Sequence, residues 1–416
     1  MRIQFILCIM VPALAGAQPL ASLVDEALRS NREILAAQKK YEAARQRPSQ
    51  AGALPDPSIS LGYTSNGGPW PVAGIGRAAT SNVGLMVSQE MPFPGKRQLR
   101  TEIASKEADA EFQQYLAVRL DIASRLKQAY HELHHANAGA AFIVREQELL
   151  RNMLRIAEAR YSVGRAAQQD IFKMQTQFSI FQAQLLRYQQ ERTAREIEIN
   201  ALLNRRQGRH IEVPMEMAIG ELPATLEEML SNARIHGPAV AREQKLVERD
   251  EAASNLARRD YLPDYTVSGG YFNQGSMPPM WQVRVDVKLP AWIWRKQHAA
   301  VTEQEFTTSQ SRHNYEAVNV ALEARIREDY AIAETARKLI DLYQKSAIPE
   351  AQLALESSMS GYETGKLDFL AVFSNFMNVV DYELMYHEEV MQFHVALARL
   401  EGNACFSLPD AERGPQ

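Results

Sequence analysis

The residues most suggestive of chemistry form one short run in the first half of the chain. His131-Glu132-Leu133-His134-His135 matches the pattern H-E-x-x-H, in which two histidines bind zinc and the glutamate activates water. In a helix, His131 and His135 would share one face. A catalytic zinc also needs a third protein ligand and an open position, and no Gly-x-x-His follows the run. One hypothesis is a zinc-dependent hydrolase. The alternative is that these residues form a solvated helix face, or a part of a tunnel wall that passing cations contact.

Other reactive patterns are few. Met277-Pro278-Pro279-Met280 carries two thioethers, which favour soft metals, although the prolines alone account for a turn at this place. The sequence has no phosphate-binding glycine loop and no nucleophile elbow. These observations favour a protein that has no cofactor, no resident metal and no catalytic activity.

Composition narrows the class of protein. The chain has 416 residues, a formal net charge of −4 and a pI near 6.2, so it lacks the basic surface that nucleic acid requires of a partner. Cys8 and Cys405 are its two cysteines, too few for a disulfide framework or a cysteine-based metal cluster. The mean hydropathy of −0.32 argues against a helical membrane protein.

The first 17 residues are predicted to be an export signal. Arg2 gives the positive start, residues 3–14 are mostly apolar, and Ala15-Gly16-Ala17 matches a cleavage site, so the mature chain is expected to begin at Gln18. An uncleaved anchor is the alternative, but the apolar run is short for a membrane span. We expect the protein to leave the cytoplasm.

The two halves of the chain repeat one another. Three pairs of segments recur in one order, at offsets between 198 and 208 residues: Leu54-Pro55-Asp56 with Leu262-Pro263-Asp264, Pro92 before Lys96-Arg97 with Pro290 before Arg295-Lys296, and Tyr161-x-x-Gly164-Arg165 with Tyr362-x-x-Gly365-Lys366. A repeat this long predicts two similar structural units rather than a solenoid of short ones.

Each predicted unit has the same order of elements. The first (residues 18–213) holds a helix over about 20–47 closed by Pro48, strands at about 57–65 and 82–91, and a helical hairpin over 95–204. The second (214–402) holds a helix, strands at about 264–273 and 281–290, and a hairpin over 295–402; residues 403–416 form a tail. In the second hairpin, we expect a kink at Pro349, because its ring removes one backbone hydrogen bond.

The hairpins have the spacing of coiled coils. If residues 97–161 form one helix, it spans roughly 100 Å. Over about 168–204, apolar residues recur at steps of three and four that only Arg192 and Arg195 break, which is typical of a coiled-coil seam, and the second hairpin repeats the pattern less strictly. The seam residues are Ile171, Met174, Phe178, Phe181, Leu185, Tyr188, Ile199 and Leu202 in the first hairpin, and Val372, Val379, Tyr382, Tyr386, Phe393, Ala396 and Leu400 in the second.

The extended segments alternate between apolar and polar residues. From Trp281 to Leu289 every second residue is apolar, and the residues between them are polar or charged. A half-buried sheet in water is one interpretation. The other is a lipid-facing sheet, because the chain is expected to be exported and all four tryptophans lie at or beyond the segment ends, as in membrane-interface belts. These are Trp70, Trp281, Trp292 and Trp294.

Four lipid-facing strands require partners. In hydrocarbon an open sheet edge leaves backbone groups without hydrogen bonds, at several kcal/mol each, and the smallest membrane barrels have about eight strands. The hypothesis therefore predicts that several chains pool their strands.

Together these features resemble the TolC family of outer-membrane efflux channels. The resemblance rests on the repeated halves, the paired strands, the junction Gln89-Glu90-Met91-Pro92-Phe93-Pro94-Gly95-Lys96, the step Ile348-Pro349-Glu350-Ala351 and the two Tyr-x-x-Gly turns. It implies a fold that is mainly α with a β membrane part: a homotrimer with a 12-stranded β-barrel and an α-helical tunnel in the periplasm. The junction resembles the heavy-metal or cation-efflux branch.

The resemblance also assigns roles to residues. In the family, such turns form the periplasmic tip. The adaptor protein of an inner-membrane pump docks there, and for this chain the resemblance implies a pump of RND type. The corresponding positions are Tyr161, Gly164, Arg165, Tyr362, Gly365 and Lys366. The simpler interpretation is a pair of helix C-caps, and both can hold.

Family channels narrow through acidic residues soon after the second turn, and this sequence departs from that pattern. Ala371 and Ser374 stand where the acidic pair is expected, while Asp170 and Asp368 lie nearby. A threefold ring of either aspartate would attract cations in a narrow passage. The alternative is that each is a helix N-cap.

The sequence thus predicts an outer-membrane exit duct of a tripartite efflux system, which carries metal cations or small toxic compounds. The remaining alternative is an exported coiled-coil scaffold. A scaffold of helices alone has no use for the alternating strands, which argues against it.

Overall fold

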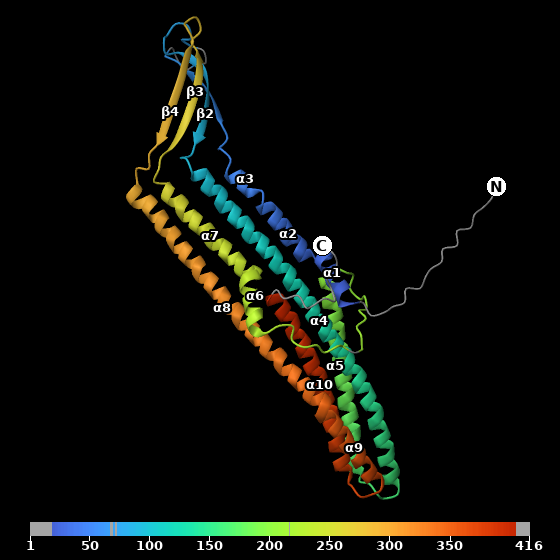
Figure 1. The fold of residues 1–416 in the computed structure, drawn as a ribbon. Helices are drawn as coiled ribbons and strands as arrows, with labels where there is room; N and C mark the ends of the chain where they lie inside the picture. Colours follow the sequence, from blue (N-terminus) through green and yellow to red (C-terminus); the bar gives the residue numbers. More distant parts are fainter. Residues whose placement is uncertain (1–18, 67–69, 71–72, 216, 405–416) are drawn as a thin grey trace, which may run out of the picture. The chain divides into compact units, whose positions relative to one another are not determined.

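The computed structural model describes residues 19–66, 70, 73–215 and 217–404. The predicted export segment, Gln18 and Cys405 lie outside these residues, as does most of the predicted tail. The described chain is mostly helical with four strands (Figure 1), so the predicted fold class, mainly helical with a small β part, is confirmed. No helix among the described residues is both long enough and apolar enough to cross a membrane.

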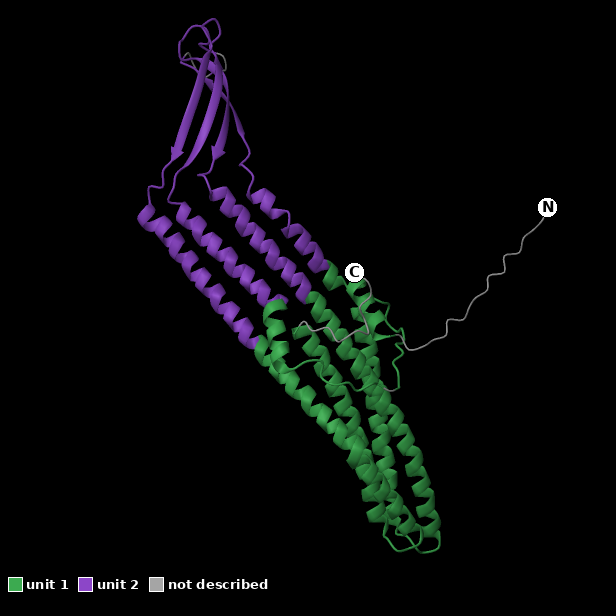
Figure 2. Cartoon of the chain, viewed as in Figure 1, with its two compact units in different colours: residues 1–35, 118–237, 322–416 green, residues 36–117, 238–321 purple. Residues whose placement is uncertain are grey.

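The chain divides into two compact units (Figure 2). Residues 36–117 and 238–321 form what we call the sheet unit, and residues 1–35, 118–237 and 322–416 form the hairpin unit.

The sheet unit contains one antiparallel sheet whose strands are ordered as in the sequence. The strands are β1 (Ser58–Thr64), β2 (Asn82–Met91), β3 (Asp264–Asn273) and β4 (Met280–Lys288). Each pairs with the next, so β1 and β4 are the two edges. Two distant parts of the chain therefore meet at the β2–β3 pair.

Strand register places the apolar residues of all four strands on one face of the sheet. Leu61 pairs with Leu85, Leu85 with Tyr271, and Tyr271 with Trp281, and paired residues share a face. This face, called the apolar face below, comprises Ile59, Leu61, Tyr63, Val83, Leu85, Val87, Tyr265, Val267, Tyr271, Trp281, Val283, Val285 and Val287. Most of it is exposed in the single chain; Leu61 is 83% and Val283 81% exposed.

The opposite face of the sheet is mainly polar. Ser268 Oγ donates to Ser88 Oγ at 2.9 Å, and Arg284 Nε donates to Asp286 Oδ2 at 2.8 Å. Phe272 is an exception whose ring lies over Gly84, where an added Cβ would come within 2.0 Å of it. The two faces differ in chemistry, as a sheet between lipid and water requires.

A buried lysine joins the strands to the helices. Lys96, 2% exposed, begins the long helix that follows β2, and its Nζ lies 3.0 Å from Asp264 Oδ1 and 3.2 Å from Asp260 Oδ1. It also donates to the Leu262 carbonyl at 3.0 Å, while the Phe93 N–H donates to Asp264 Oδ1 at 2.8 Å. The β2–helix junction and the helix–β3 junction are thereby held together.

Helices make up the rest of the two units. In the first half of the chain they are α1 (Leu20–Ser30), α2 (Arg32–Ala44), α3 (Arg47–Ala51), α4 (Lys96–Ser162) and α5 (Gln168–Leu202). In the second half they are α6 (Leu226–His236), α7 (Pro238–Arg259), α8 (His298–Leu342), α9 (Ile348–Glu363) and α10 (Phe369–Ala404), with π-helical turns at Ile293–Gln297 and Tyr343–Ala347.

The hairpin unit is built on the predicted seam. Met174 and Phe181 of α5 are fully buried in one core with residues of α4, α9 and α10, and Ile171, Phe178, Leu185 and Tyr188 pack against it. Phe181 meets Phe376 edge to face, with centroids 6.2 Å apart. A second core joins α6, α8 and α10 around Phe393. The steps of three and four therefore do mark the buried helix faces.

The prediction of one helix over residues 20–47 was wrong. Asn31 has an extended backbone between α1 and α2, and its Oδ1 accepts hydrogen bonds from the N–H groups of Glu33 and Ile34. Its Nδ2 donates to the Leu202 carbonyl at 2.9 Å, which fixes the break. Pro48 lies in the first turn of α3, where a missing N–H costs nothing, so it does not close a helix.

Two interruptions also occur in the second half. Gly237 separates α6 from α7, and Pro238 is the first residue of α7. At Pro349 the interruption takes the form of a π-helical turn just before the proline, with the Ile348 N–H bonded to the Tyr343 carbonyl. A proline at the second position of α9 avoids the clash it would cause inside a helix.

We predict that Lys96→Met lowers the free energy of unfolding by about 2–3 kcal/mol, because two carboxylates lose the ammonium that they share at a buried position. The measurement is denaturant unfolding of the purified protein. Lys338→Met is the matched control: Lys338 is an exposed partner of Glu334, and its loss should cost less than about 0.5 kcal/mol. Equal midpoints for the two variants would contradict the role given to Lys96.

Candidate functional site

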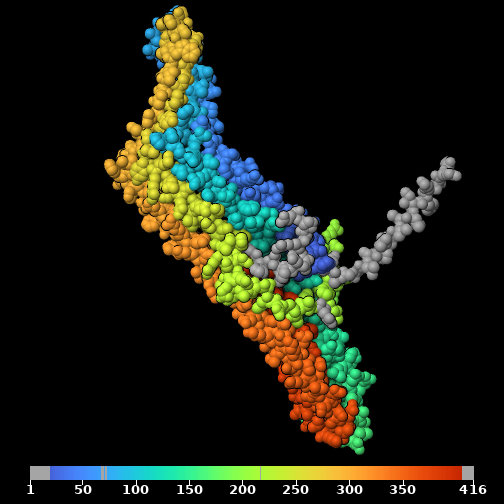
Figure 3. Space-filling model, viewed as in Figure 1, coloured from blue at the N-terminus to red at the C-terminus, as the bar shows by residue number. Residues whose placement is uncertain are grey.

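The two predicted tip turns have the same geometry. Gly164 follows α4 with φ +72° and Gly365 follows α9 with φ +78°. In each, the glycine N–H bonds to the carbonyl three residues before it, and the next N–H bonds to a carbonyl five residues before it, Arg160 or Gly361, at 2.8 Å. This is the Schellman helix C-cap, in which a left-handed glycine relieves backbone strain. In the space-filling view, α9–α10 and the end of α4 lie side by side at this tip (Figure 3).

The two tip tyrosines are not equivalent. Tyr161 is 45% exposed, whereas Tyr362 is 8% exposed and packs edge to face on Phe369 with centroids 6.3 Å apart. The guanidinium of Arg160 lies 4.2 Å from the centroid of the Tyr362 ring and donates to the Tyr362 carbonyl. Tyr161 is therefore surface, while Tyr362 holds the two hairpins together.

Charge gathers in one hollow at the tip. The hollow measures about 420 Å³, and its lining includes Arg160, Arg165, Asp170, Tyr362 and Asp368. Burial raises the pKa of the Tyr362 hydroxyl; Arg160 opposes that rise and Asp170 adds to it. The structure thus brings both predicted gate aspartates into one place with two arginines.

Both aspartates also cap helices. The Asp368 Oδ1 accepts from the Ala371 N–H at 2.9 Å, as an N-cap of α10 does. The Asp170 Oδ2 accepts from the Ala167 N–H at 3.3 Å in the first turn of α5. Ala167 has no side chain to return the bond, so only half of a capping box forms. A capping role is therefore established by geometry for each.

The tryptophans of the sheet unit stand at opposite ends of the strands. Trp281, 77% exposed, follows the β3–β4 loop and meets Tyr271 edge to face at 5.0 Å, while Trp70 lies in the β1–β2 loop and is 76% exposed. Trp292 and Trp294 follow β4 at its helix end, and both are more than 70% exposed. In the single chain, each end of the sheet thus carries exposed indole rings.

The zinc-like motif does not form a zinc site. His131 Nδ1 lies 3.1 Å from Met217 Sδ, whereas His135 Nε2 lies 3.4 Å from Glu388 Oε2. Glu132 forms an ion pair with Arg195 at 3.0 Å, and burial raises the pKa of its carboxyl. In the part of the chain that the structure describes, no three His, Cys, Asp or Glu side chains could together hold a metal ion.

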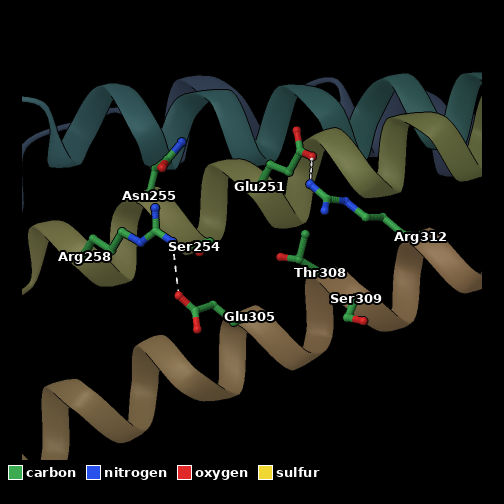
Figure 4. A pocket seen from close by; sticks show the side chains of 8 residues that line it. All are labelled: Glu251, Ser254, Asn255, Arg258, Glu305, Thr308, Ser309 and Arg312. Carbon is green, nitrogen blue, oxygen red and sulfur yellow. Dashed lines mark hydrogen bonds and ion pairs between the residues drawn. The ribbon is translucent and has the colours of Figure 1, made fainter.

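A polar groove runs between α7 and α8 in the sheet unit (Figure 4). It measures about 450 Å³ and is crossed by two ion pairs, Arg258 with Glu305 at 3.1 Å and Arg312 with Glu251 at 2.7 Å. Exposed pairs of this kind contribute less than about 1 kcal/mol each. The groove is a solvated helix seam rather than a reactive site.

Some functional residues were missed by sequence reasoning. Lys96 gave no signal beyond its place in a repeated basic pair, because its partners lie more than 160 residues away. His387 and His394 lie two helical turns apart on α10 and approach the α4 histidines. Their spacing of seven could have indicated one shared helix face.

Comparison with known proteins shows which family the chain resembles. The model of the family described as outer membrane efflux protein matches residues 23–205. The match covers 183 of the 416 residues, so the first half of the chain is similar to this family. The outer membrane protein TolC of Vibrio cholerae is 20% identical over 365 residues, covering 84% of this chain and 82% of TolC. A probable outer membrane lipoprotein of Salmonella typhimurium, SilC, is 25% identical over 382 residues, covering 84% and 77%.

Solved structures agree on the fold. The outer membrane protein VceC of Vibrio cholerae superposes with a TM-score of 0.78 at 18% identity, covering 92% of this chain and 96% of VceC. The predicted resemblance is therefore confirmed. TolC and SilC are outer membrane proteins, which agrees with the predicted outer-membrane location of this chain and with a channel rather than an enzyme. The zinc hydrolase hypothesis was wrong.

The buried histidines make the hairpin unit acid-sensitive. Burial, together with the nearby His135, His134 and Arg145, lowers the pKa of His387 from 6.5 to about 4. Between these two pH values His387 is protonated in the unfolded chain and neutral in the folded chain. The free energy of unfolding therefore falls as the pH drops from about 6.5 to about 4.

We predict that His387→Phe, which keeps the contact with Phe142, removes up to about 3 kcal/mol of the stability lost between pH 7 and pH 4.5. The measurement is denaturant unfolding at both pH values, with exposed His313→Phe as the control. The same acid loss in wild type and His387→Phe would contradict this account.

Proposed function

We propose that the chain is the exit duct of a tripartite efflux system. Three copies would span the outer membrane with a 12-stranded barrel, and the trimer would dock to a periplasmic adaptor and an inner-membrane pump of RND type. The observation that supports this most strongly is the sheet. It has one continuous apolar face, exposed in the single chain, and two edge strands without partners among the described residues.

Closure of the sheet follows from strand direction. Three antiparallel pairings separate β1 from β4, so these edges run in opposite directions. The β4 strand of one copy can therefore pair antiparallel with β1 of the next, and every backbone group finds a partner, as lipid requires. Two copies would give eight strands, whose interior side chains fill. Three copies give twelve strands and leave room for passage.

The tryptophans support the membrane position of this barrel. Trp70 and Trp281 lie at one end of the strands, and Trp292 and Trp294 lie at the other. Indole rings favour both membrane–water boundaries, because the ring is apolar and its N–H needs a polar partner. Three of the four strands have nine or ten residues, the length that a tilted barrel strand needs between two such belts, and β1 has seven.

The repeated hairpins supply the docking tip. Exposed Tyr161, Arg165 and Lys366 would contact the adaptor, while Gly164 and Gly365 shape the turns and Tyr362 braces them. The same order of elements in both halves, helices, two strands and a helical hairpin, supports the predicted duplication. Six such turns in a trimer would present a ring of alternating, similar tips.

Asp170 and Asp368 would form the gate. Their carboxylates line one hollow at the tip, and threefold repetition would multiply the negative potential that attracts cations. This supports metal cations as cargo, with small toxic compounds as the other class. A capping aspartate can serve in both roles, since the cap uses only one carboxylate oxygen.

An exported coiled-coil scaffold is the remaining alternative. A scaffold in water does not explain the apolar face or the tryptophans at both ends of the strands. These apolar side chains would then be exposed to water.

The duct is tested by single-channel recording in planar lipid bilayers with a potassium chloride gradient. We expect stable pores with a preference for cations. Asp170→Asn and Asp368→Asn keep the cap but remove the charge, so cation preference should fall at least about twofold, or conductance should rise.

Two controls separate the possibilities. Glu221→Gln, far along the chain from the turns, should change nothing, and Asp368→Ala should match Asp368→Asn if charge rather than capping controls conduction. Absence of pores in the wild type contradicts the duct. Wild-type pores with unchanged selectivity and conductance in both asparagine variants contradict the gate alone.

A further inference from the structure

Histidines gather where α4 meets α10 in the hairpin unit. Nine histidines occur in the chain, and five of them lie on these two helices: His131, His134, His135, His387 and His394. The rings of His131 and His394 are stacked, with centroids 4.6 Å apart and planes 10° from parallel. The proposed duct uses none of these side chains, so their concentration needs its own explanation.

A methionine completes this cluster from a third segment. Met217 lies in the connection between α5 and α6, and its Sδ is 3.1 Å from His131 Nδ1. The same connection is tied to α4 two residues earlier, where the Met215 carbonyl lies 3.1 Å from His134 Nε2. One thioether and two imidazoles are thereby brought together from three separate parts of the chain.

The cluster is poorly satisfied by ordinary hydrogen bonds. A thioether is a weak acceptor, yet it is the partner of His131 Nδ1. His394 Nε2 is buried and has no hydrogen-bond partner among the described residues. Burial lowers the pKa of His394 to about 4 and holds that of His131 well below its usual range, aided by His394. Two imidazole rings and a thioether thus lie together with little hydrogen bonding to compete for their ring nitrogens and sulfur.

Two nearby carboxylates form ion pairs with basic side chains. Glu132 pairs with Arg195 at 3.0 Å, and Glu401 pairs with Lys127 at 2.5 Å. A hard cation prefers charged oxygen ligands, and none of His131, Met217 and His394 supplies one. Imidazole with thioether suits a soft monovalent ion instead.

We propose that His131, Met217 and His394 form a binding site for one soft monovalent metal ion, Cu(I) or Ag(I), in each chain. An ion held between His131 Nδ1 and Met217 Sδ, at bond lengths near those of Zn–N and Zn–S, sets these atoms roughly 3.8 Å apart. The present contact of 3.1 Å therefore has to open by under about 1 Å. The segment that carries Met217 would move by that distance, and one of the stacked rings of His131 and His394 would turn so that both reach the ion.

The site does not depend on the proposed duct. Metal binding is measured on the purified full chain in detergent without any conduction assay, so either proposal can fail while the other stands. The probe is Ag(I) alone, followed by equilibrium dialysis and metal analysis and by competition with a chelator of known affinity. We expect one tightly held Ag(I) per chain, and no stoichiometric Zn(II).

Met217→Leu and Met215→Leu form a matched pair in the same segment. Leucine conserves the volume of methionine, and Met215 is 75% exposed and offers its carbonyl rather than its sulfur. Met217→Leu should weaken Ag(I) binding at least about tenfold, while Met215→Leu should retain wild-type affinity. His394→Gln should also weaken it, with circular dichroism to verify folding.

Three results would overturn the site: no stoichiometric Ag(I) in the wild type, equal loss in the two leucine variants, or wild-type affinity in Met217→Leu. A second readout covers a variant that fails to fold. In the wild-type protein, bound Ag(I) should slow peroxide oxidation of Met217 at least about fivefold while leaving Met215 unchanged, and equal rates with and without Ag(I) would also contradict the site.

Discussion

The unpaired backbone groups at the two edges of the sheet are the main physical constraint on how this protein can assemble. Each edge strand, β1 and β4, offers a row of N–H and C=O groups that the chain itself does not satisfy within the described residues. Water would satisfy them, but the apolar face, with side chains up to 83% exposed, is unsuited to water. Lipid suits that face but cannot satisfy the edges. In the proposed duct, further copies of the sheet would meet both demands.

The helices depend on the same sheet through its junctions. Lys96 begins α4 directly after β2 and binds the two aspartates that lead into β3. Because that contact joins segments more than 160 residues apart, it sets the spacing between the central strands and the helices that continue from them. The tip turns then reverse the hairpins by one repeated device, a left-handed glycine followed by an aspartate near the next helix start.

Sequence reasoning recovered what is local or periodic. The alternation from Trp281 to Leu289 and the seam from Ile171 to Leu202 each reflect a repeat that one element imposes on its own residues. The turns at Gly164 and Gly365 were visible because only glycine takes that conformation without strain. The family followed from the order of these signals.

What sequence reasoning missed depends on partners far apart in the chain. Asn31 breaks the first helix because Leu202 accepts its amide hydrogen bond, and nothing near residue 31 indicates that contact. Glu132 lies in a motif that predicts zinc chemistry, but its carboxylate forms an ion pair with Arg195. His131 meets His394 and Met217 through tertiary packing alone. Spacing in one helix cannot reveal ligands that come from another.

The most direct measurement of the central claim is disulfide cross-linking between the two sheet edges. With Cys405→Ser as background, Ser60→Cys on β1 is combined in turn with Gln282→Cys, Arg284→Cys and Asp286→Cys on β4, all on the polar face. Within one chain, two strands separate these edges by roughly 14 Å, too far for a disulfide. Covalent trimers in at least one pair, absent from Ser60→Cys alone, are predicted; monomers in all three pairs would contradict the account.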